Sequence, residues 1–243
     1  MLIDIHAHVL PGLDDGPATM DETLQMARAF VADGTGVVFA TSHGFSRHYH
    51  AEPDEIRAAV VRVNEMLTAH ALPLSVLPGM EVHYHQRILE TFERGDAIGY
   101  GGEASPRHML LELSLREWPQ ALADTLYELR LRGTLPILAH AERYPELQRH
   151  PERLLGIVRE GALVQVTAGS ILGEFGGVCE RLCHRWLREG LVHVIASDAH
   201  DSVARKPGIR PALERVAGPW RLPDAAQACE RTAGEILRET RRG

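Results

Sequence analysis

The chain begins Met1-Leu2-Ile3-Asp4-Ile5-His6-Ala7-His8, a short apolar run that ends in two histidines. Side chains alternate along a β-strand, so we expect His6 and His8 to project from one face, about two residues of rise apart. That spacing lets two imidazoles bind a single metal ion. The same spacing returns near the end of the chain in Asp198-Ala199-His200.

Six further runs rich in Val, Ile and Leu follow, and segments of helical period separate them. This alternation is typical of repeated βα units around a parallel sheet. The seven strands that we expect cover residues 2–6, 36–41, 74–78, 109–113, 135–139, 162–167 and 191–196. The sequence therefore predicts an α/β fold of the barrel type.

The segments between these runs carry signals for the ends of helices. Thr19 with Glu22 three residues later resembles a capping box, and Pro53 and Pro151 suit first helical turns. Three glycines suit helix C-termini, namely Gly133, Gly161 and Gly190.

Length and composition bound the class of protein. A chain of 243 residues that is 44% hydrophobic suits one domain over 1–243. The sequence has neither an apolar stretch of about 18 residues nor the basic start and apolar run of a signal peptide, so we expect a cytoplasmic protein without an integral membrane segment. A net charge of -7 argues against nucleic acid as a partner. Oligomeric state is not predictable from these features.

Potential metal ligands follow six of the seven expected strands, at the end of the barrel where such folds carry their chemistry. They are His6, His8, Asp15, His43, Glu81, Glu112, His140, Asp198 and His200. Any one of them alone is more often a hydrogen-bonded structural residue. Burying all nine without cations would leave several costly uncompensated charges. We therefore expect two or three divalent ions, and the absence of thiolates from the set favours Mn, Fe or Zn.

These motifs, in this order, resemble the PHP (polymerase and histidinol phosphatase) superfamily of metal-dependent phosphoesterases, and most closely its bacterial tyrosine-phosphatase branch of capsule and exopolysaccharide operons. The resemblance runs from residue 1 to about 210. The segments that carry it are Asp4-Ile5-His6-Ala7-His8, Leu13-Asp14-Asp15-Gly16, Ala40-Thr41-Ser42-His43, Pro78-Gly79-Met80-Glu81, Leu111-Glu112, Ala139-His140-Ala141-Glu142-Arg143-Tyr144, Gln165-Val166-Thr167-Ala168, Gly173-Glu174-Phe175-Gly176 and Ala196-Ser197-Asp198-Ala199-His200. It implies a distorted (β/α)7, TIM-like barrel.

The chain departs from this family locally. Ala141 stands where many relatives have proline, and the loop of residues 44–50 follows no family pattern. We expect that loop to touch the substrate. Four more histidines lie outside the pattern and are interpreted as surface or substrate-side residues: His48, His50, His83 and His85.

The resemblance also implies how the residues act. One metal would take His6, His8, Glu81 and Asp198, a second Glu81, Glu112 and His140, and a third Asp15, His43 and His200. A metal-activated water would attack phosphorus without a covalent phosphoenzyme. Arg143 and Arg205 would act as catalytic residues that clamp phosphoryl oxygens, although an arginine in isolation is more often a solvated surface residue.

The implied function is a metal-dependent protein-tyrosine phosphatase acting on the phosphotyrosine-bearing tail of a bacterial tyrosine kinase of polysaccharide export. One alternative is a small-molecule phosphomonoesterase such as histidinol-phosphate phosphatase, which would use the same metals. A non-enzymatic alternative is an accessory domain that has lost activity. The intact ligand set argues against the latter.

A cysteine-dependent phosphatase also needs consideration, because Cys179 and Arg185 have the C-x5-R spacing of that class. That chemistry requires a glycine-permissive loop whose N–H groups bind phosphate and lower the thiol pKa. The surrounding residues instead form an apolar helical stripe of Phe175, Val178, Cys179, Leu182, Cys183 and Trp186. We therefore expect Cys179 and Cys183 to be packing residues.

Overall fold

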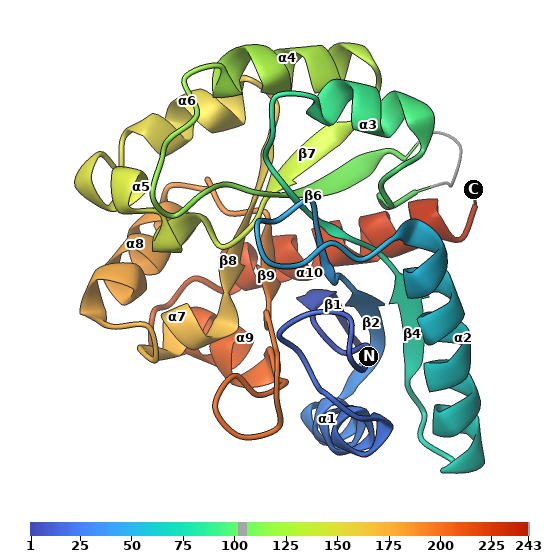
Figure 1. The fold of residues 1–243 in the computed structure, drawn as a ribbon. Coiled ribbons are helices and arrows are strands. Elements are labelled where there is room, and N and C mark those ends of the chain that lie inside the picture. The colour runs from blue at the N-terminus through green and yellow to red at the C-terminus, as the bar shows by residue number, and fades with distance from the viewer. Residues whose placement is uncertain (102–105, 243) are drawn as a thin grey trace.

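The computed structural model describes residues 1–101 and 106–242 and is a mixed α/β fold built on a curled parallel sheet (Figure 1). Every pair of neighbouring strands is parallel. One group of strands has the order β1 (Leu2–Ala7), β2 (Thr35–Ala40), β4 (Ser75–Pro78). The other has the order β3 (His43–Gly44), β5 (Glu81–His83), β6 (His108–Glu112), β7 (Leu135–Leu138), β8 (Leu163–Thr167), β9 (Val194–Ala196).

Backbone hydrogen bonds join the two groups. The N–H of His8 donates to the carbonyl of Ala199 at 2.8 Å, and the N–H of Asp198 donates to the carbonyl of His6 at 2.9 Å, so the first and last strands lie side by side. At the other junction the chain continues from β2 into β3 and from β4 into β5, and between these pairs the N–H of Gly79 donates to the carbonyl of Ala40 at 3.0 Å. The sheet therefore curls until its ends approach, and the residues that follow its strands gather at one rim.

All seven predicted runs overlap observed strands, namely β1, β2, β4, β6, β7, β8 and β9. The short strands β3 and β5 are additional, because the chain resumes sheet pairing just after β2 and β4. The α/β class and the curled parallel sheet are thus confirmed. The exact (β/α)7 count remains a prediction.

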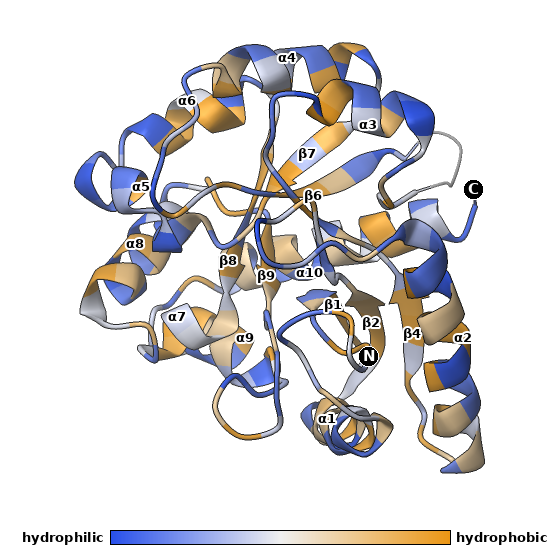
Figure 2. Cartoon of the chain, in the orientation of Figure 1, coloured by the Kyte–Doolittle hydropathy of each residue, from blue (hydrophilic) through white to orange (hydrophobic). Residues whose placement is uncertain are grey.

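Helices cover the outside of the sheet (Figure 1). They are α1 (Met20–Asp33), α2 (Pro53–Ala69), α3 (Ile88–Arg94), α4 (Leu122–Leu131), α5 (Pro145–Arg149), α6 (Arg153–Arg159), α7 (Ala168–Leu172), α8 (Gly177–Arg188), α9 (Arg210–Ala217) and α10 (Pro223–Thr240), with a 3-10 turn η1 (Ala141–Arg143). Figure 2 shows apolar strands at the centre and helices with one polar and one apolar face, the pattern of a buried sheet with an amphipathic outer layer. No helix in the described part of the chain is long and apolar enough to cross a membrane.

The helix-end signals are largely confirmed. The N–H of Glu22 donates to Oγ1 of Thr19 and the N–H of Thr19 to Oε2 of Glu22, which completes the capping box of α1. Pro53 begins α2, whereas Pro151 lies two residues before α6 begins at Arg153. The three predicted helix-stop glycines all adopt left-handed backbone, with φ of 84°, 93° and 71° at Gly133, Gly161 and Gly190.

An apolar cluster inside the sheet supports the rim. Phe39 and Tyr100 pack edge to face with ring centroids 4.8 Å apart, and the Tyr100 hydroxyl donates to the carbonyl of Ile5 at 2.7 Å. Ile236 of α10 belongs to the same cluster. Burial of a side chain such as Phe39 or Ile236 contributes about 1.5–3 kcal/mol relative to leaving it exposed. This packing fixes the strands whose ends carry the polar residues.

Candidate metal centre

The nine predicted ligands come together at the rim of the curled sheet. Six are almost fully buried, and the side chains of His43, Glu112 and Asp15 are 13%, 16% and 39% exposed. The cluster is therefore a pocket of ionisable groups that opens to solvent on one side.

Glu81 lies at the centre of the cluster, close to four histidines. Its carboxylate lies 3.3 Å from Nε2 of His6, 3.3 Å from Nε2 of His8, 3.0 Å from Nδ1 of His43 and 3.0 Å from Nε2 of His140. Only 1% of this side chain is exposed. A buried carboxylate surrounded by four imidazoles has the arrangement of a residue that bridges metal ions.

Asp198 divides its two oxygens between imidazoles and arginines. Oδ1 lies 3.3 Å from Nε2 of His6 and 3.6 Å from Nε2 of His8. Oδ2 accepts hydrogen bonds from Arg143 at 2.7 Å and Arg205 at 2.6 Å. The two predicted phosphate-binding arginines therefore meet at the edge of the cluster, 21% and 30% exposed.

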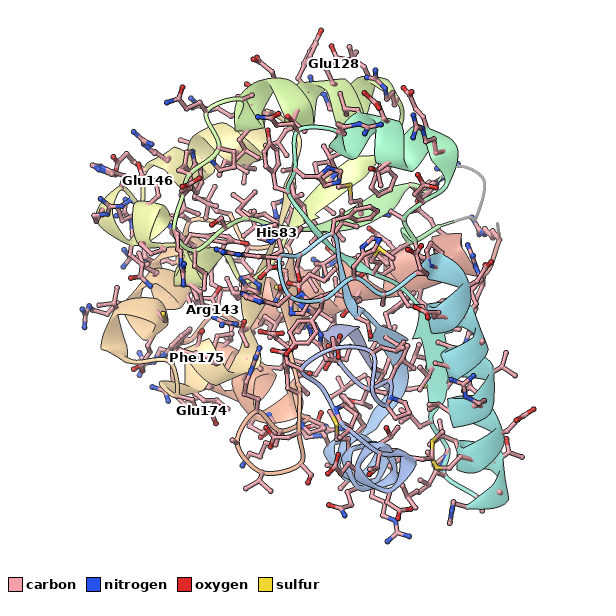
Figure 3. All side chains as sticks on the ribbon, in the orientation of Figure 1. His83, Glu128, Arg143, Glu146, Glu174 and Phe175 are labelled. Carbon is pink, nitrogen blue, oxygen red and sulfur yellow. The ribbon has the colours of Figure 1, made fainter. Side chains whose placement is uncertain are left out.

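Phe175 supports one of these arginines. Its ring centroid lies 4.8 Å from the guanidinium carbon of Arg143, a cation–π contact. Figure 3 shows Arg143 and Phe175 close together to the left of the centre of this view, whereas Glu128 and Glu146 lie farther out. The prediction that Phe175 belongs to the α8 stripe is wrong, because Phe175 lies before α8 begins at Gly177.

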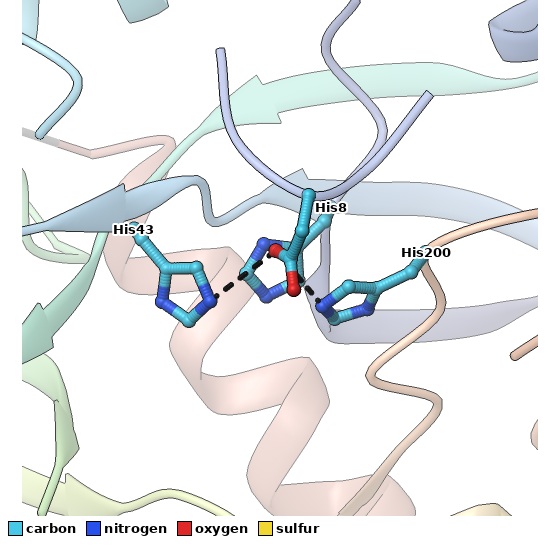
Figure 4. A group of neighbouring side chains, drawn as sticks. His8, His43 and His200 are labelled. Carbon is cyan, nitrogen blue, oxygen red and sulfur yellow. Dashed lines mark ion pairs between the residues drawn. The ribbon is translucent and has the colours of Figure 1, made fainter. Parts of the chain in front are cut away.

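Asp15 connects two further histidines. Its Oδ1 lies 3.4 Å from Nε2 of His43 and 3.4 Å from Nε2 of His200. Figure 4 shows these two rings and that of His8 gathered around one carboxylate. The His8 and His200 ring centroids are only 3.9 Å apart.

Glu112 lies near three histidines. Its Oε1 is 3.8 Å from Nε2 of His140, and its Oε2 is 3.6 Å from Nδ1 of His43. Oε2 also accepts a hydrogen bond of 2.9 Å from Nδ1 of His83. His83, interpreted from the sequence as a surface or substrate-side residue, thus contacts a predicted ligand directly.

The donor atoms form three groups whose members all lie within 4.8 Å of one another. They are His8, Asp15, His43 and His200; His6, His8 and Glu81; and His43, Glu81 and Glu112. The structure thus brings the predicted ligands together, and the first group contains the predicted third set with His8 added. His43 also lies close enough to Glu81 and Glu112 to share a site with them.

Two residues of the site were not among the sequence-predicted ligands. Asp14 accepts a hydrogen bond from Nδ1 of His8 at 2.7 Å. Oε1 of Gln165 lies 3.1 Å from Nδ1 of His6 and accepts from the N–H of His140 at 2.8 Å. Both stand within the quoted motifs, yet nothing in their type or spacing indicated which histidine they contact. Such contacts orient an imidazole and fix which nitrogen faces a metal.

The free nitrogens provide a test of whether these residues suit metal ions. With Nδ1 of each ring engaged, Nε2 of His6 and Nε2 of His8 are buried and make no hydrogen bond. A buried polar atom without a partner is destabilising. Both nitrogens face the carboxylates of Glu81 and Asp198. A divalent cation between them would satisfy all four groups, so the residues fit divalent metal.

The turn of residues 14–16 is packed closely beneath His8. The N–H of Gly16 donates to Oδ1 of Asp14 at 3.0 Å, and a Cβ at Gly16 would lie 2.7 Å from the carbonyl oxygen of His8. Only glycine permits this approach. The turn therefore holds Asp14 against His8 and presents Asp15 to the cluster.

Backbone strain is concentrated at the same rim. Five non-glycine residues in the described ranges have positive φ, and three of them lie here: Phe45 at 62°, His140 at 31° and Asp198 at 53°. Left-handed backbone is unfavourable for residues that carry a Cβ and persists where the surroundings impose it, commonly at functional sites.

Charge pairing shifts the ionisation of the cluster. Burial disfavours the charged form of His8, but the Asp14 carboxylate outweighs burial and raises the pKa of His8 to about 9. The same pair lowers the pKa of Asp14 to about 2 against the effect of burial. Burial is likewise outweighed at Glu81, whose pKa is held well below its usual range by His6 and His43. Asp14 and Glu81 are thus ionised, and the Glu81 carboxylate is available to cations.

The cysteines of α8 lack the features of a nucleophile. Cys179 and Cys183 are buried, and Sγ of Cys179 donates to the carbonyl of Glu142 at 3.4 Å. Burial raises the pKa of both thiols. They are packing residues, as predicted, although Val178 of the same predicted stripe is 44% exposed.

Comparison with known proteins gives the family. The family model for capsular polysaccharide synthesis, CpsB/CapC, matches residues 2–233. This chain belongs to the CpsB/CapC family. It is 33% identical over 204 residues to tyrosine-protein phosphatase YwqE of Bacillus subtilis. The aligned region covers 84% of this chain and 79% of that protein. It is 25% identical to tyrosine-protein phosphatase CpsB of Streptococcus pneumoniae, over 89% of this chain and 90% of the relative.

Solved structures agree with this membership. A crystal structure from work on YwqE of Bacillus subtilis and CpsB of Streptococcus pneumoniae, described as metal-dependent tyrosine phosphatases, superposes with a TM-score of 0.84 at 31% identity and covers 95% of both chains. Histidinol phosphate phosphatase from Lactococcus lactis superposes with a TM-score of 0.57 at 12% identity, and the match covers 96% of this chain and 94% of that one. The second likeness shows the fold alone.

Proposed function

We propose that this CpsB/CapC member is a metal-dependent protein-tyrosine phosphatase that hydrolyses phosphotyrosine monoesters. The observation that carries the proposal is the cluster of five imidazoles and four carboxylates in which Nε2 of His6 and Nε2 of His8 are buried without hydrogen bonds. Relatives named tyrosine-protein phosphatases support the substrate class.

The nine clustered side chains would hold two or three divalent ions, with Mn, Fe or Zn as the candidates. His6, His8, Glu81 and Asp198 would hold one ion, Glu81, Glu112 and His140 a second, and Asp15, His43 and His200 a third. Bound divalent ions supply the Lewis acidity that activates a water for attack on phosphorus and neutralises the phosphoryl oxygens. Asp14 and Gln165 would keep the ligand nitrogens of His8 and His6 turned toward the ions.

Arg143 and Arg205 would bind the transferred phosphoryl group. Each uses only one terminal nitrogen on Asp198, and both side chains are partly open to solvent. A planar guanidinium held in this way retains further N–H donors for phosphoryl oxygens. The contact with Phe175 fixes the plane of Arg143 before substrate arrives.

The proposed physiological substrate is the phosphotyrosine-bearing tail of a bacterial tyrosine kinase, in accordance with the family's place in capsular polysaccharide synthesis. Turnover of a phosphotyrosine peptide and of histidinol phosphate by the metal-loaded protein tests the proposal. We expect kcat/KM to favour the peptide. A preference for histidinol phosphate would assign the chain to the small-molecule alternative.

A further inference from the structure

The loop of residues 44–50 is built to hold one aromatic side chain in place. The N–H of Tyr49 donates to Oγ of Ser46 at 2.9 Å, and that hydroxyl donates to the carbonyl of Tyr49 at 2.8 Å. The N–H of Ala51 donates to the carbonyl of His43 at 3.1 Å, which closes the loop onto the metal centre. In Figure 1 the loop crosses in front of the strands before it enters α2.

Phe45 anchors the start of this loop. Its N–H donates to Nδ1 of His50 at 2.9 Å, and its ring packs against the rings of His50 and His85, with centroids 4.6 and 4.9 Å away. The φ of 62° at Phe45 is the left-handed conformation that these contacts impose. These contacts give the loop a defined conformation, and they hold the backbone of Tyr49 in a fixed position.

Tyr49 lies beside the metal centre and open to solvent. Its ring is nearly parallel to that of His43, at an angle of 12° and a centroid distance of 6.0 Å. Only two aromatic rings are among the large apolar side chains exposed in residues 1–101 and 106–242, Tyr49 at 37% and Tyr127 at 44%. Tyr127 lies on the outer helix α4 under Arg130. Tyr49 therefore differs from Tyr127 in its position: it lies at the rim of the site, where it can contact a bound substrate.

We propose that Tyr49 is a specificity-determining residue that stacks on the phenyl ring of a phosphotyrosine substrate; the inference rests on the proposed phosphatase function. In phosphotyrosine a single oxygen joins phosphorus to the ring, so a phosphoryl group bound at the cluster puts that ring at the rim. Aromatic pairs prefer offset-parallel or edge-to-face packing, and the open part of Tyr49 offers such a surface. A serine or other alkyl phosphate has no ring to place there.

The decisive measurement is binding rather than turnover. Benzylphosphonate and ethylphosphonate are non-hydrolysable probes that differ by the ring, and calorimetry on the Mn-loaded protein gives Kd for each. We expect Tyr49→Ala to weaken benzylphosphonate about 3- to 10-fold and to leave ethylphosphonate unchanged. Tyr49→Phe keeps the ring and should bind both probes as the wild type does. Tyr127→Ala is the matched control.

Equal weakening of both probes by Tyr49→Ala, or no weakening of either, would overturn the stacking role. Thermal unfolding of the variants checks that the loop change leaves the fold intact. A different result would contradict the proposed function itself: wild-type protein that binds benzylphosphonate but does not hydrolyse a phosphotyrosine peptide. With that peptide, we expect Tyr49→Ala to raise KM and to change kcat little.

Discussion

Nδ1 of His8 and Oδ2 of Asp14 lie 2.7 Å apart, and this contact leaves Nε2 of His8 free to face Glu81. The same carboxylate oxygen accepts from the backbone N–H of His43 at 3.1 Å. Asp14 therefore orients one predicted ligand and positions the strand that carries another.

Replacing Asp14 tests this orienting role. Asp14→Asn removes the charge that holds the proton on Nδ1 of His8, and losing such a contact typically weakens metal affinity about 10- to 100-fold. We expect activity to return at saturating Mn. Titration of activity and metal content against free Mn measures the shift, with the exposed Asp21→Asn as the control. An unchanged titration curve would show that Asp14 has no part in metal binding.

Removal of metal is the second prediction. The nine clustered ligands imply that exhaustive chelation abolishes phosphatase activity and that Mn, Co, Fe or Zn restores it to different degrees. Because the metal-free cluster leaves buried nitrogens unpaired, chelation should also lower Tm. Full turnover in protein verified as metal-free by elemental analysis would contradict the proposed chemistry.

Substitution of a ligand and of a cysteine separates two classes of phosphatase. His140→Ala and Asp198→Ala each remove a proposed ligand and should lower kcat by orders of magnitude. Cys179→Ser should leave kcat nearly unchanged, since this thiol donates to the carbonyl of Glu142 and accepts from Nε2 of Gln148, and neither partner is a proposed metal ligand. Steady-state kinetics of these variants on a phosphotyrosine peptide distinguishes metal-dependent from cysteine-dependent chemistry. A folded Cys179→Ser protein without activity would point to cysteine chemistry instead.

Arg143 gives the fourth prediction. Arg143→Ala removes a donor held on Asp198 and Phe175, and loss of such a preorganised group typically lowers kcat about 10²- to 10³-fold. Arg143→Lys keeps the charge but loses the planar fork, so it should recover only part of the activity. Metal content is measured in parallel. If activity is lost only together with metal, Arg143 supports Asp198 rather than the phosphoryl group.

Thiol reactivity gives the fifth prediction. Burial raises the pKa of Cys229 to about 12 and that of Cys183 well above its usual range, so both thiols remain protonated at pH 8. Only the thiolate reacts rapidly with a disulfide reagent. We expect slow labelling of the native protein and complete labelling of three cysteines in denaturant. Immediate labelling of Cys183 in native protein would show that α8 is more open than its packing indicates.

The sequence by itself determined the α/β class and which nine potential ligands lie together. Apolar runs at regular intervals require a buried parallel sheet, and the C-terminal ends of parallel strands meet at one rim. Ligands as distant in sequence as His6 and Asp198 were therefore predictable as neighbours. Their Nε2 and Oδ1 atoms lie 3.3 Å apart.

Only the tertiary structure decided which atom of each ligand is free and what supports it. Gln165 is 159 residues from His6 in the sequence, and both arginines converge on a single oxygen of Asp198. The position of Phe175 under Arg143 likewise depends on where α8 begins. Strand periodicity fixes the face on which a side chain lies, whereas hydrogen bonds of about 3 Å depend on the curl of the sheet and the path of each loop, which arise from packing of the whole chain.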